Sequence, residues 1–296
     1  MTMADETTAT ARDGGIRLYS TADGALRTAV FHLMTMPFTL RLRHADEDTL
    51  RVAAEACRGS LAGVDRTFSP FRPDSLTSRA NRGDWGGLLR DPDFAEVYAR
   101  ASMAADLTRG HFRAMRHGRY DPVGLVKGWA IERAFDRFLR PLLDGGRAEA
   151  AVLGGGGDMQ AGVRPGSDFT WGVGIEDPGR ADMLAGTVRL GCGAVATSGL
   201  SKRGGHIDRM PAWDGSRSGR DPSDDVIQAT VVGTHLTDAD MWATTAVAAG
   251  LERFRTLTAR EDDPSFAALL VMRDGHTARI HPRTPFGKDH EHRHDA

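Results

Sequence analysis

The sequence contains few cysteines and tyrosines and no long apolar run. Its two cysteines, Cys57 and Cys192, lie far apart and form neither a disulfide framework nor a zinc pattern, so we expect both to be small core residues. No stretch of about 18 apolar residues occurs, so we expect no membrane-spanning segment. The N-terminus lacks the basic start and apolar run of a signal peptide. We therefore expect a cytoplasmic protein.

Neither sign of charge predominates. The chain has 38 basic and 40 acidic residues, a formal net charge of -2, and so shows no global basic field of the kind that binds nucleic acid. Hydrophobic residues make up 40% of the chain, which is typical of a globular protein. What is abundant is glycine, with 35 residues, and this favours tight turns and loops in which backbone approaches a ligand.

The order of apolar patterns predicts an α+β fold. We expect a disordered N-terminus over residues 1–15, one mixed α/β domain of one or two lobes over residues 16–287, and a polar tail over residues 288–296. The tail carries alternate histidines, which suit either a disordered end or a metal-binding tract. We expect a loop over residues 68–87, helices over residues 46–64, 91–108, 124–142 and 239–251, and mainly strands from residue 148 onward.

The predicted start of the last helix carries a carboxylate, Asp240, and a hydroxyl, Thr244, four residues apart. Residues at this spacing share one helix face, and two hard oxygen ligands there suit Mg²⁺. The alternative is a capping box, in which Thr237 caps the helix and Asp240 reaches back to it.

Three further segments have candidate chemistry, each with a structural alternative. Gly154 to Gly157 precede Asp158 and form either an anion-binding loop or a plain glycine turn. Lys127 lies between Gly124 and Gly128, where it either meets a phosphate or lies on a solvated helix face.

The third segment is a strand that ends in Thr197, Ser198 and Gly199, followed by His206. His206 is either a general base near neutral pH or an exposed loop residue. No nucleophile elbow or Cys/His pairing supports covalent hydrolase chemistry.

Together and in this order, these segments resemble the ApbE family, the FAD:protein FMN transferases. The resemblance extends from Met34 to about Gly250. The matching segments are Phe68–Ser75 with Asn81, Gly110–Phe112, Lys127–Ala130, Gly156–Asp158, Ala196–Gly199, His206–Ile207, and Ala239–Asp240 with Thr244.

The resemblance implies a mixed α/β fold that holds FAD in a cleft with Mg²⁺ on its pyrophosphate. It implies that Asp240, Thr244 and the carbonyl of Gly124 hold the metal, and that His206 is the catalytic residue beside the reacting groups. The cofactor-binding residues that it implies are Phe71, Ser75, Lys127, Gly156, Gly157, Asp158, Thr197 and Ser198.

The reaction implied is transfer of FMN from FAD to a Thr hydroxyl of an acceptor protein, with release of AMP. Three positions depart from the family pattern: Thr35 replaces a glycine, Arg113 replaces an aspartate, and residues 208–217 replace an Asp-Pro-x-Thr-Gly segment. Thr does not suit a position that needs a positive φ. The departures leave two alternatives, an FAD-binding protein that does not transfer and an FAD pyrophosphatase that yields FMN and AMP.

Overall fold

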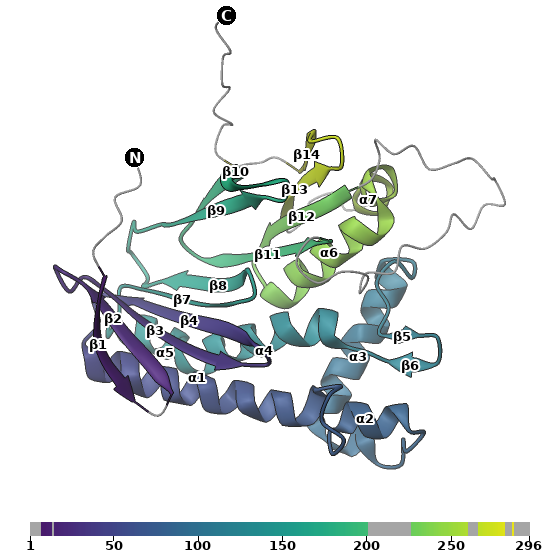
Figure 1. Ribbon diagram of the computed structural model, residues 1–296, viewed down its shortest axis with the longest axis horizontal. Coiled ribbons are helices and arrows are strands. Elements are labelled where there is room, and N and C mark those ends of the chain that lie inside the picture. Colours follow the sequence, from purple (N-terminus) through teal and green to yellow (C-terminus); the bar gives the residue numbers. More distant parts are fainter. Residues whose placement is uncertain (1–6, 14, 201–225, 260–265, 282–285, 287–296) are drawn as a thin grey trace, which may run out of the picture.

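The fold is built on one antiparallel sheet, seen in a computed structural model that describes residues 7–13, 15–200, 226–259, 266–281 and 286 (Figure 1). Within these residues ten strands pair in the order β1-β2-β3-β4-β7-β8-β11-β12-β13-β14. The bounds of these strands are β1 Thr7–Asp13, β2 Ile16–Thr21, β3 Leu26–Leu33, β4 Met36–Arg43, β7 Ala150–Gly155, β8 Asp158–Val163, β11 Gly193–Gly199, β12 Val226–Gly233, β13 Phe266–Met272 and β14 Thr277–Ile280.

The helices occur in two blocks along the chain. The first block lies between β4 and β7 and includes a small ribbon of two strands, β5 and β6. The second, shorter block lies between β12 and β13. The first block comprises α1 Glu47–Phe68, α2 Leu76–Asn81, a short 3-10 turn Leu88–Arg90, α3 Pro92–Leu107, β5 Met115–Arg116, β6 Arg119–Tyr120, α4 Val123–Phe138 and α5 Arg140–Asp144. The second block comprises α6 Leu236–Ala249 and α7 Leu251–Thr258.

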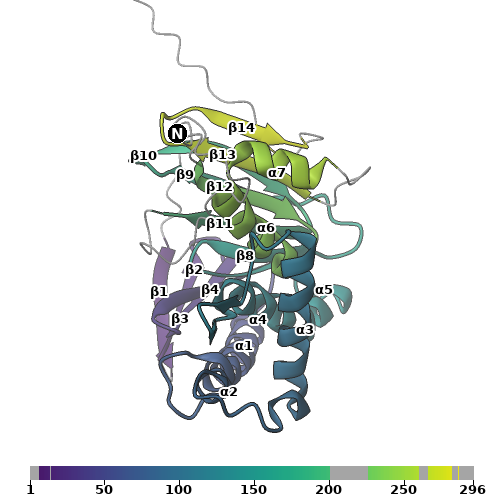
Figure 2. The same cartoon turned by 90° about the vertical axis from the view of Figure 1, so that its right-hand side faces the viewer.

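The helices cover one face of the sheet and enclose the larger core (Figure 2). On β4, Phe38, Leu40 and Leu42 alternate with more exposed residues and point into this core, as the alternating pattern predicts. Helix α6 is buried along almost its whole length. A helix buried on all sides has little freedom to move, so it is a firm support for functional side chains.

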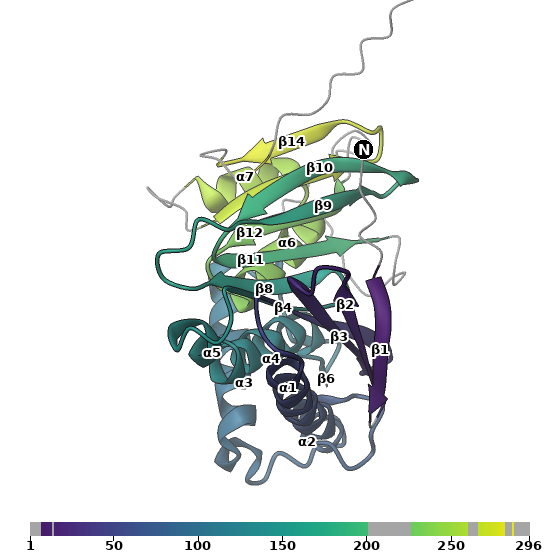
Figure 3. The same ribbon diagram turned by 90° about the vertical axis from the view of Figure 1, so that its left-hand side faces the viewer.

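A ribbon of two strands, β9 Trp171–Asp177 and β10 Arg180–Leu190, covers part of the opposite face (Figure 3). It encloses a second, smaller core in which Trp171 and Val188 of the ribbon join sheet residues such as Val195. The strands β8, β11 and β12 are therefore covered on both faces, which explains why most of their residues are buried, polar ones such as Asp158 and Gln160 included.

Several predicted elements are confirmed in position and cause. Asp91 caps α3 by accepting a hydrogen bond from the Phe94 amide at 2.9 Å, and Pro92 is the first helical residue. The hairpin of β13 and β14 turns at Gly275, whose φ of 88° is readily adopted by glycine. The mixed helix and sheet composition confirms the α+β prediction.

Three expectations are wrong. Residues 7–13, expected to be disordered, form β1 and pair with β2. The expected loop over residues 68–87 contains α2, capped by Ser75. Cys192, expected in the core, is exposed in the turn between β10 and β11, whereas Cys57 is buried as expected. The two glycines that flank Cys192, Gly191 and Gly193, form this turn and are the sequence signal for it.

The turn between β3 and β4 holds the first departure from the family pattern. Met34 has a φ of 49° and Thr35 a φ of 61°, both in the left-handed region. The turn therefore forms even with Thr at this position. The other part of the expectation stands, because the left-handed region is unfavourable for a β-branched residue. The Thr35 hydroxyl donates to the Met34 carbonyl at 2.7 Å, a local hydrogen bond within the turn.

The helices that the structure describes include none that is both long enough and apolar enough to span a bilayer.

Candidate functional site

The candidate site is a cluster of buried charges where α4, α6, β8 and β11 meet. The Lys127 ammonium on α4 forms an ion pair with the Asp158 carboxylate on β8 and lies 3.8 Å from Asp240 Oδ1 on α6. The side chains of Lys127, Asp158 and Asp240 are 13%, 0% and 3% exposed. The alternative of a solvated helix face for Lys127 is therefore wrong. Charges buried this deeply persist only when they are paired or hydrogen-bonded.

Helices α4 and α6 approach closely because residue 128 has no side chain. A Cβ on Gly128 would lie 2.8 Å from the Leu236 carbonyl oxygen and 3.0 Å from Asp240 Cβ. This contact lets the Gly128 amide donate to Asp240 Oδ2 at 3.2 Å. Gly128 therefore determines where the Asp240 carboxylate lies.

The floor of the cluster comes from β8 and β11. Asp158 Oδ1 accepts a hydrogen bond from the Thr197 amide at 2.9 Å, and the Thr197 hydroxyl lies 2.9 Å from that of Thr230 on β12. The hydroxyls of Ser198 and Thr244 are 3.0 Å apart, which joins β11 to α6. The structure thus brings six of the predicted polar site residues together: Lys127, Asp158, Thr197, Ser198, Asp240 and Thr244.

The capping-box alternative for Thr237 and Asp240 is wrong. Helix α6 begins at Leu236 with His235 as its N-cap, and His235 makes no side-chain capping bond. The Thr237 hydroxyl donates to Glu132 Oε2 at 2.6 Å, and the Asp240 carboxylate points to α4. Asp240 is therefore not used to cap its own helix.

The glycine run forms a hairpin. Gly154 and Gly155 belong to β7, and Gly156 and Gly157 turn the chain with φ of 64° and 97°. The turn leads directly into Asp158, the first residue of β8. The turn alternative thus describes this segment, and Gly156 and Gly157 are exposed beside the buried cluster. Contact of these two glycines with a cofactor stays a prediction.

The residues of the Phe68–Ser75 segment lie between α1 and α2. Phe71 is 88% exposed, whereas Ser75 is fully buried. The Ser75 hydroxyl accepts from the Ser78 amide at 3.0 Å and donates to the Ser69 carbonyl at 2.7 Å. Ser75 therefore caps α2 and closes the loop, which places Phe71 at its surface.

A side chain of α2 connects this loop to the start of α4. Asn81 accepts a hydrogen bond from the Tyr120 amide at 2.7 Å and donates to the Tyr120 carbonyl at 2.9 Å. Tyr120 lies three residues before Val123, where α4 begins. Gly124 follows, and a Cβ there would lie 3.3 Å from the Phe112 ring. These contacts thus tie the loop that carries Phe71 to the start of α4, the helix that carries Lys127.

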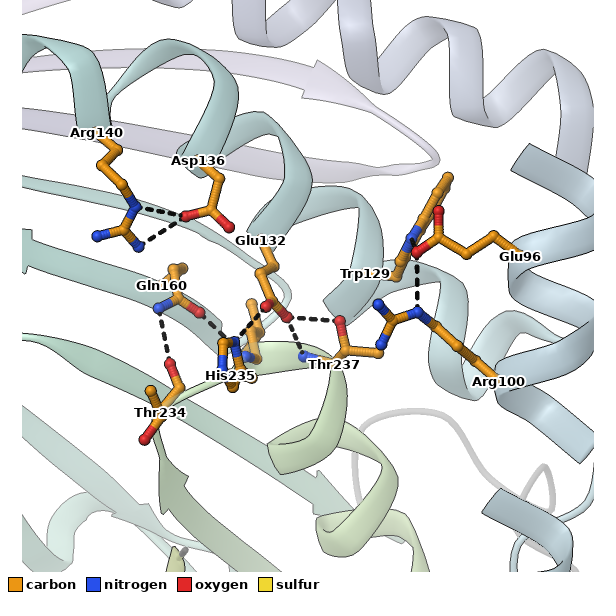
Figure 4. A network of polar contacts seen from close by, with 11 residues as sticks. Glu96, Arg100, Trp129, Glu132, Asp136, Arg140, Gln160, Thr234, His235 and Thr237 are labelled. Carbon is orange, nitrogen blue, oxygen red and sulfur yellow. Dashed lines mark hydrogen bonds and ion pairs between the residues drawn. The ribbon is translucent and has the colours of Figure 1, made fainter. Parts of the chain in front are cut away.

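Two polar side chains beside the cluster were not predicted from the sequence. Glu132 and Gln160 supply acceptors to the first amides of α6 (Figure 4). Burial raises the pKa of the neighbouring Asp238 carboxyl, and the Glu132 carboxylate adds to the rise. The only sequence signal for Glu132 is its spacing of four from Gly128, which places both on one face of α4.

His206, the predicted base, lies outside the residues that the structure describes, as do residues 208–217 and the polar tail.

Comparison with known proteins adds to this geometry. Residues 114–270, more than half of the chain, match the sequence profile of the ApbE family. The fold is similar to the ApbE protein of Thermotoga maritima, with a TM-score of 0.66 and 20% identity over 86% of this chain and 97% of that chain.

Two other solved structures are similar over 86% of this chain. The flavinyl transferase ApbE of Pseudomonas stutzeri, in its apo form, has a TM-score of 0.63 and 18% identity, with 94% of that chain covered. The flavin transferase ApbE of Vibrio cholerae has a TM-score of 0.59 and 18% identity, with 96% covered. A search of curated proteins gave no significant match.

Proposed function

Because this chain belongs to the ApbE family, we propose that it transfers FMN from FAD to a threonine hydroxyl of an acceptor protein, with Mg²⁺ as its metal and AMP as the second product. The structurally similar proteins of Vibrio cholerae and Pseudomonas stutzeri are named flavin and flavinyl transferases, which supports a flavin substrate.

The observation that carries the proposal is the position of the Lys127 ammonium between the Asp158 and Asp240 carboxylates. Burying three charges lowers stability unless their pairing is good, and such clusters occur preferentially at functional sites. Lys127 is the most exposed of the three, with 13% of its side chain accessible, so it can meet a phosphate of an incoming ligand. Asp158, which is itself held by a hydrogen bond from the Thr197 amide, orients the Lys127 side chain.

The donor set fits Mg²⁺. The Asp240 carboxylate and the Thr244 hydroxyl lie one turn apart on α6, and the Ser198 hydroxyl is 3.0 Å from that of Thr244. Hard oxygen donors with one carboxylate suit Mg²⁺, which usually completes its shell with water and substrate phosphates. Asp240, Thr244 and the Gly124 carbonyl would hold the ion, which would neutralise pyrophosphate charge.

The transfer exchanges one phosphorus–oxygen bond for another. The acceptor hydroxyl oxygen bonds to the FMN phosphorus, the bond from that phosphorus to the bridging oxygen breaks, and AMP leaves with this oxygen. The hydroxyl proton goes to a base, for which His206 is our candidate. Lys127 stabilises the charge that develops on the phosphate oxygens.

The remaining predicted residues fit around this arrangement. Phe71 is placed at the surface of its loop, free to lie against a planar flavin ring. Gly156 and Gly157 are exposed next to Asp158, where their backbone can approach the AMP half of FAD. Thr197 and Ser198 end β11 beside the same space, while Ser75 acts through the loop that it closes.

Incubation of the purified protein with FAD, Mg²⁺ and a cell extract that supplies acceptor polypeptides tests the proposal. Transfer predicts AMP in the chromatogram and flavin fluorescence that remains on an acceptor polypeptide in a denaturing gel, both lost with a chelator. AMP with an equal amount of free FMN would indicate a pyrophosphatase instead. FAD binding without AMP under any condition would indicate a protein that binds but does not transfer.

A further inference from the structure

Helix α6 begins without a capping side chain of its own. Its N-cap, His235, makes no capping bond, and the first two helical amides find acceptors on other elements. The Leu236 amide donates to Gln160 Oε1 on β8 at 3.0 Å, and the Thr237 amide donates to Glu132 Oε2 on α4 at 2.9 Å (Figure 4). The first turn of α6 is therefore held by the elements that surround it.

Glu132 makes most of these contacts. Its Oε2 also accepts from the Thr237 hydroxyl at 2.6 Å, and its Oε1 lies 2.7 Å from His235 Nδ1. The Glu132 side chain is only 15% exposed. A carboxylate at a helix N-terminus interacts favourably with the helix dipole, and hydrogen bonds to a charged acceptor are stronger than neutral ones.

Glu132 and Gly128 both join α4 to α6, at neighbouring turns of the two helices. On α4, Gly128 and Glu132 are one turn apart, and on α6 their partners Asp240 and Thr237 are also one turn apart. The two helices are thus joined at two successive turns. One joint carries the Asp240 carboxylate, and the other fixes the end of the helix on which that carboxylate is mounted.

We propose that Glu132 is a positioning residue that closes the N-terminus of α6 from α4 and thereby fixes the Asp240 carboxylate and the Thr244 hydroxyl for the metal. Its carboxylate acts on these ligands only through the helix. The inference rests on the metal role proposed above for Asp240.

The chain supplies a matched control on the same helix. Asp136 lies one turn beyond Glu132 and pairs with Arg140 at 2.7 Å on the surface, with side chains 45% and 49% exposed. Asp136→Asn removes an acidic charge from α4 in the same way as Glu132→Gln but does not alter the start of α6.

The first measurement is calorimetric titration of Mg²⁺ into the protein with FAD bound. Glu132→Ala should weaken Mg²⁺ binding by about 10-fold or more, the usual effect of removing a group that orients a ligand. Glu132→Gln, which keeps one acceptor, should weaken it less, and Asp136→Asn should match the parent. Excess Mg²⁺ should restore most of the rate of Glu132→Ala.

A purely structural role would instead lower the folded fraction and leave the Mg²⁺ dissociation constant of the remaining folded protein unchanged. Parent affinity in both folded Glu132 variants would overturn the inference. If Glu132→Ala does not fold, Glu132→Gln alone decides between these results.

The second measurement needs no metal. Hydrogen exchange at the Gly128 amide should become faster in Glu132→Gln and stay unchanged in Asp136→Asn, because loosening α6 weakens the bond from Gly128 to Asp240. An unchanged exchange rate at the Gly128 amide would overturn the inference, whether or not the parent protein binds Mg²⁺. A parent that neither binds Mg²⁺ nor releases AMP would overturn the proposed function, and with it the metal role inferred for Glu132.

Discussion

The Asp240 carboxylate accepts a hydrogen bond at 3.2 Å from the backbone amide of Gly128, 112 residues earlier in the chain. This bond joins the last metal-binding segment predicted from the sequence to the segment that carries Lys127. Both Asp240 and Lys127 lie inside the protein, so the fold brings the two segments together.

Gly128→Ala tests this contact. A Cβ at residue 128 would lie 2.8 Å from the Leu236 carbonyl, so α6 must shift, and Asp240 with it. We expect a loss of about 1–3 kcal/mol in the free energy of unfolding, typical of overpacking, together with lower turnover. Chemical denaturation and the initial rate measure the two effects.

The matched control for Gly128→Ala is Gly59→Ala on α1. Gly59 is exposed, and a Cβ there would meet no atom within 4 Å. Alanine in a helix interior is favoured over glycine by about 1 kcal/mol, so this variant should be more stable than the parent. Equal effects at the two positions would contradict the close-packing account.

Thr35→Gly should stabilise the protein. Thr35 has a φ of 61° in the turn between β3 and β4, a region that disfavours β-branched residues. Relief of this strain should outweigh the greater flexibility of glycine in the unfolded chain and raise the free energy of unfolding by about 1 kcal/mol. Thermal unfolding of the parent and variant measures the change, and a variant that melts at a lower temperature would show that the turn is unstrained.

The two cysteines should differ sharply in reactivity. Burial raises the pKa of the Cys57 thiol to about 12, whereas Cys192 is exposed. At pH 8 Cys57 is protonated as well as inaccessible, so iodoacetamide should modify Cys192 alone in the folded protein. Mass spectrometry of tryptic peptides identifies the modified residue. Labelling of Cys57 at the rate of Cys192 would contradict the buried position of Cys57 on α1.

The sequence predicts the elements well where local chemistry decides them. Asp91 and Pro92 mark the start of α3, and the turn at Gly275 marks the last hairpin. Cys192 is expected in the core because strand-like residues lie on both sides of the Gly191-Cys192-Gly193 turn, yet the turn itself is exposed. It does not predict the partners at the start of α6, because the capping groups come from α4 and β8 in the fold. The spacing of Thr237 and Asp240 also allows a local capping box, but their partners Glu132 and Gly128 on α4 override it.

In the candidate site, too, features set by local spacing are predictable from the sequence, and features set by contacts between distant segments are not. Spacing on one helix predicts that Asp240 and Thr244 lie together, and the structure confirms this. The pairing of Lys127 with Asp158 depends on the packing of α4 against β8 and has no signal in spacing. The contribution of Glu132 depends on a contact between helices about 105 residues apart in sequence, so it emerges only from the fold.

The most direct test of the central claim is AMP release from FAD by Asp240→Asn in the presence of acceptor polypeptides as Mg²⁺ is varied. Asparagine keeps an oxygen acceptor for the Gly128 amide but removes the charge, so the variant should stay folded with a melting temperature close to that of the parent. The account predicts Mg²⁺-dependent AMP release by the parent and a loss of at least about 100-fold in the variant. AMP release by the variant at the parent rate and with the parent Mg²⁺ dependence would contradict it.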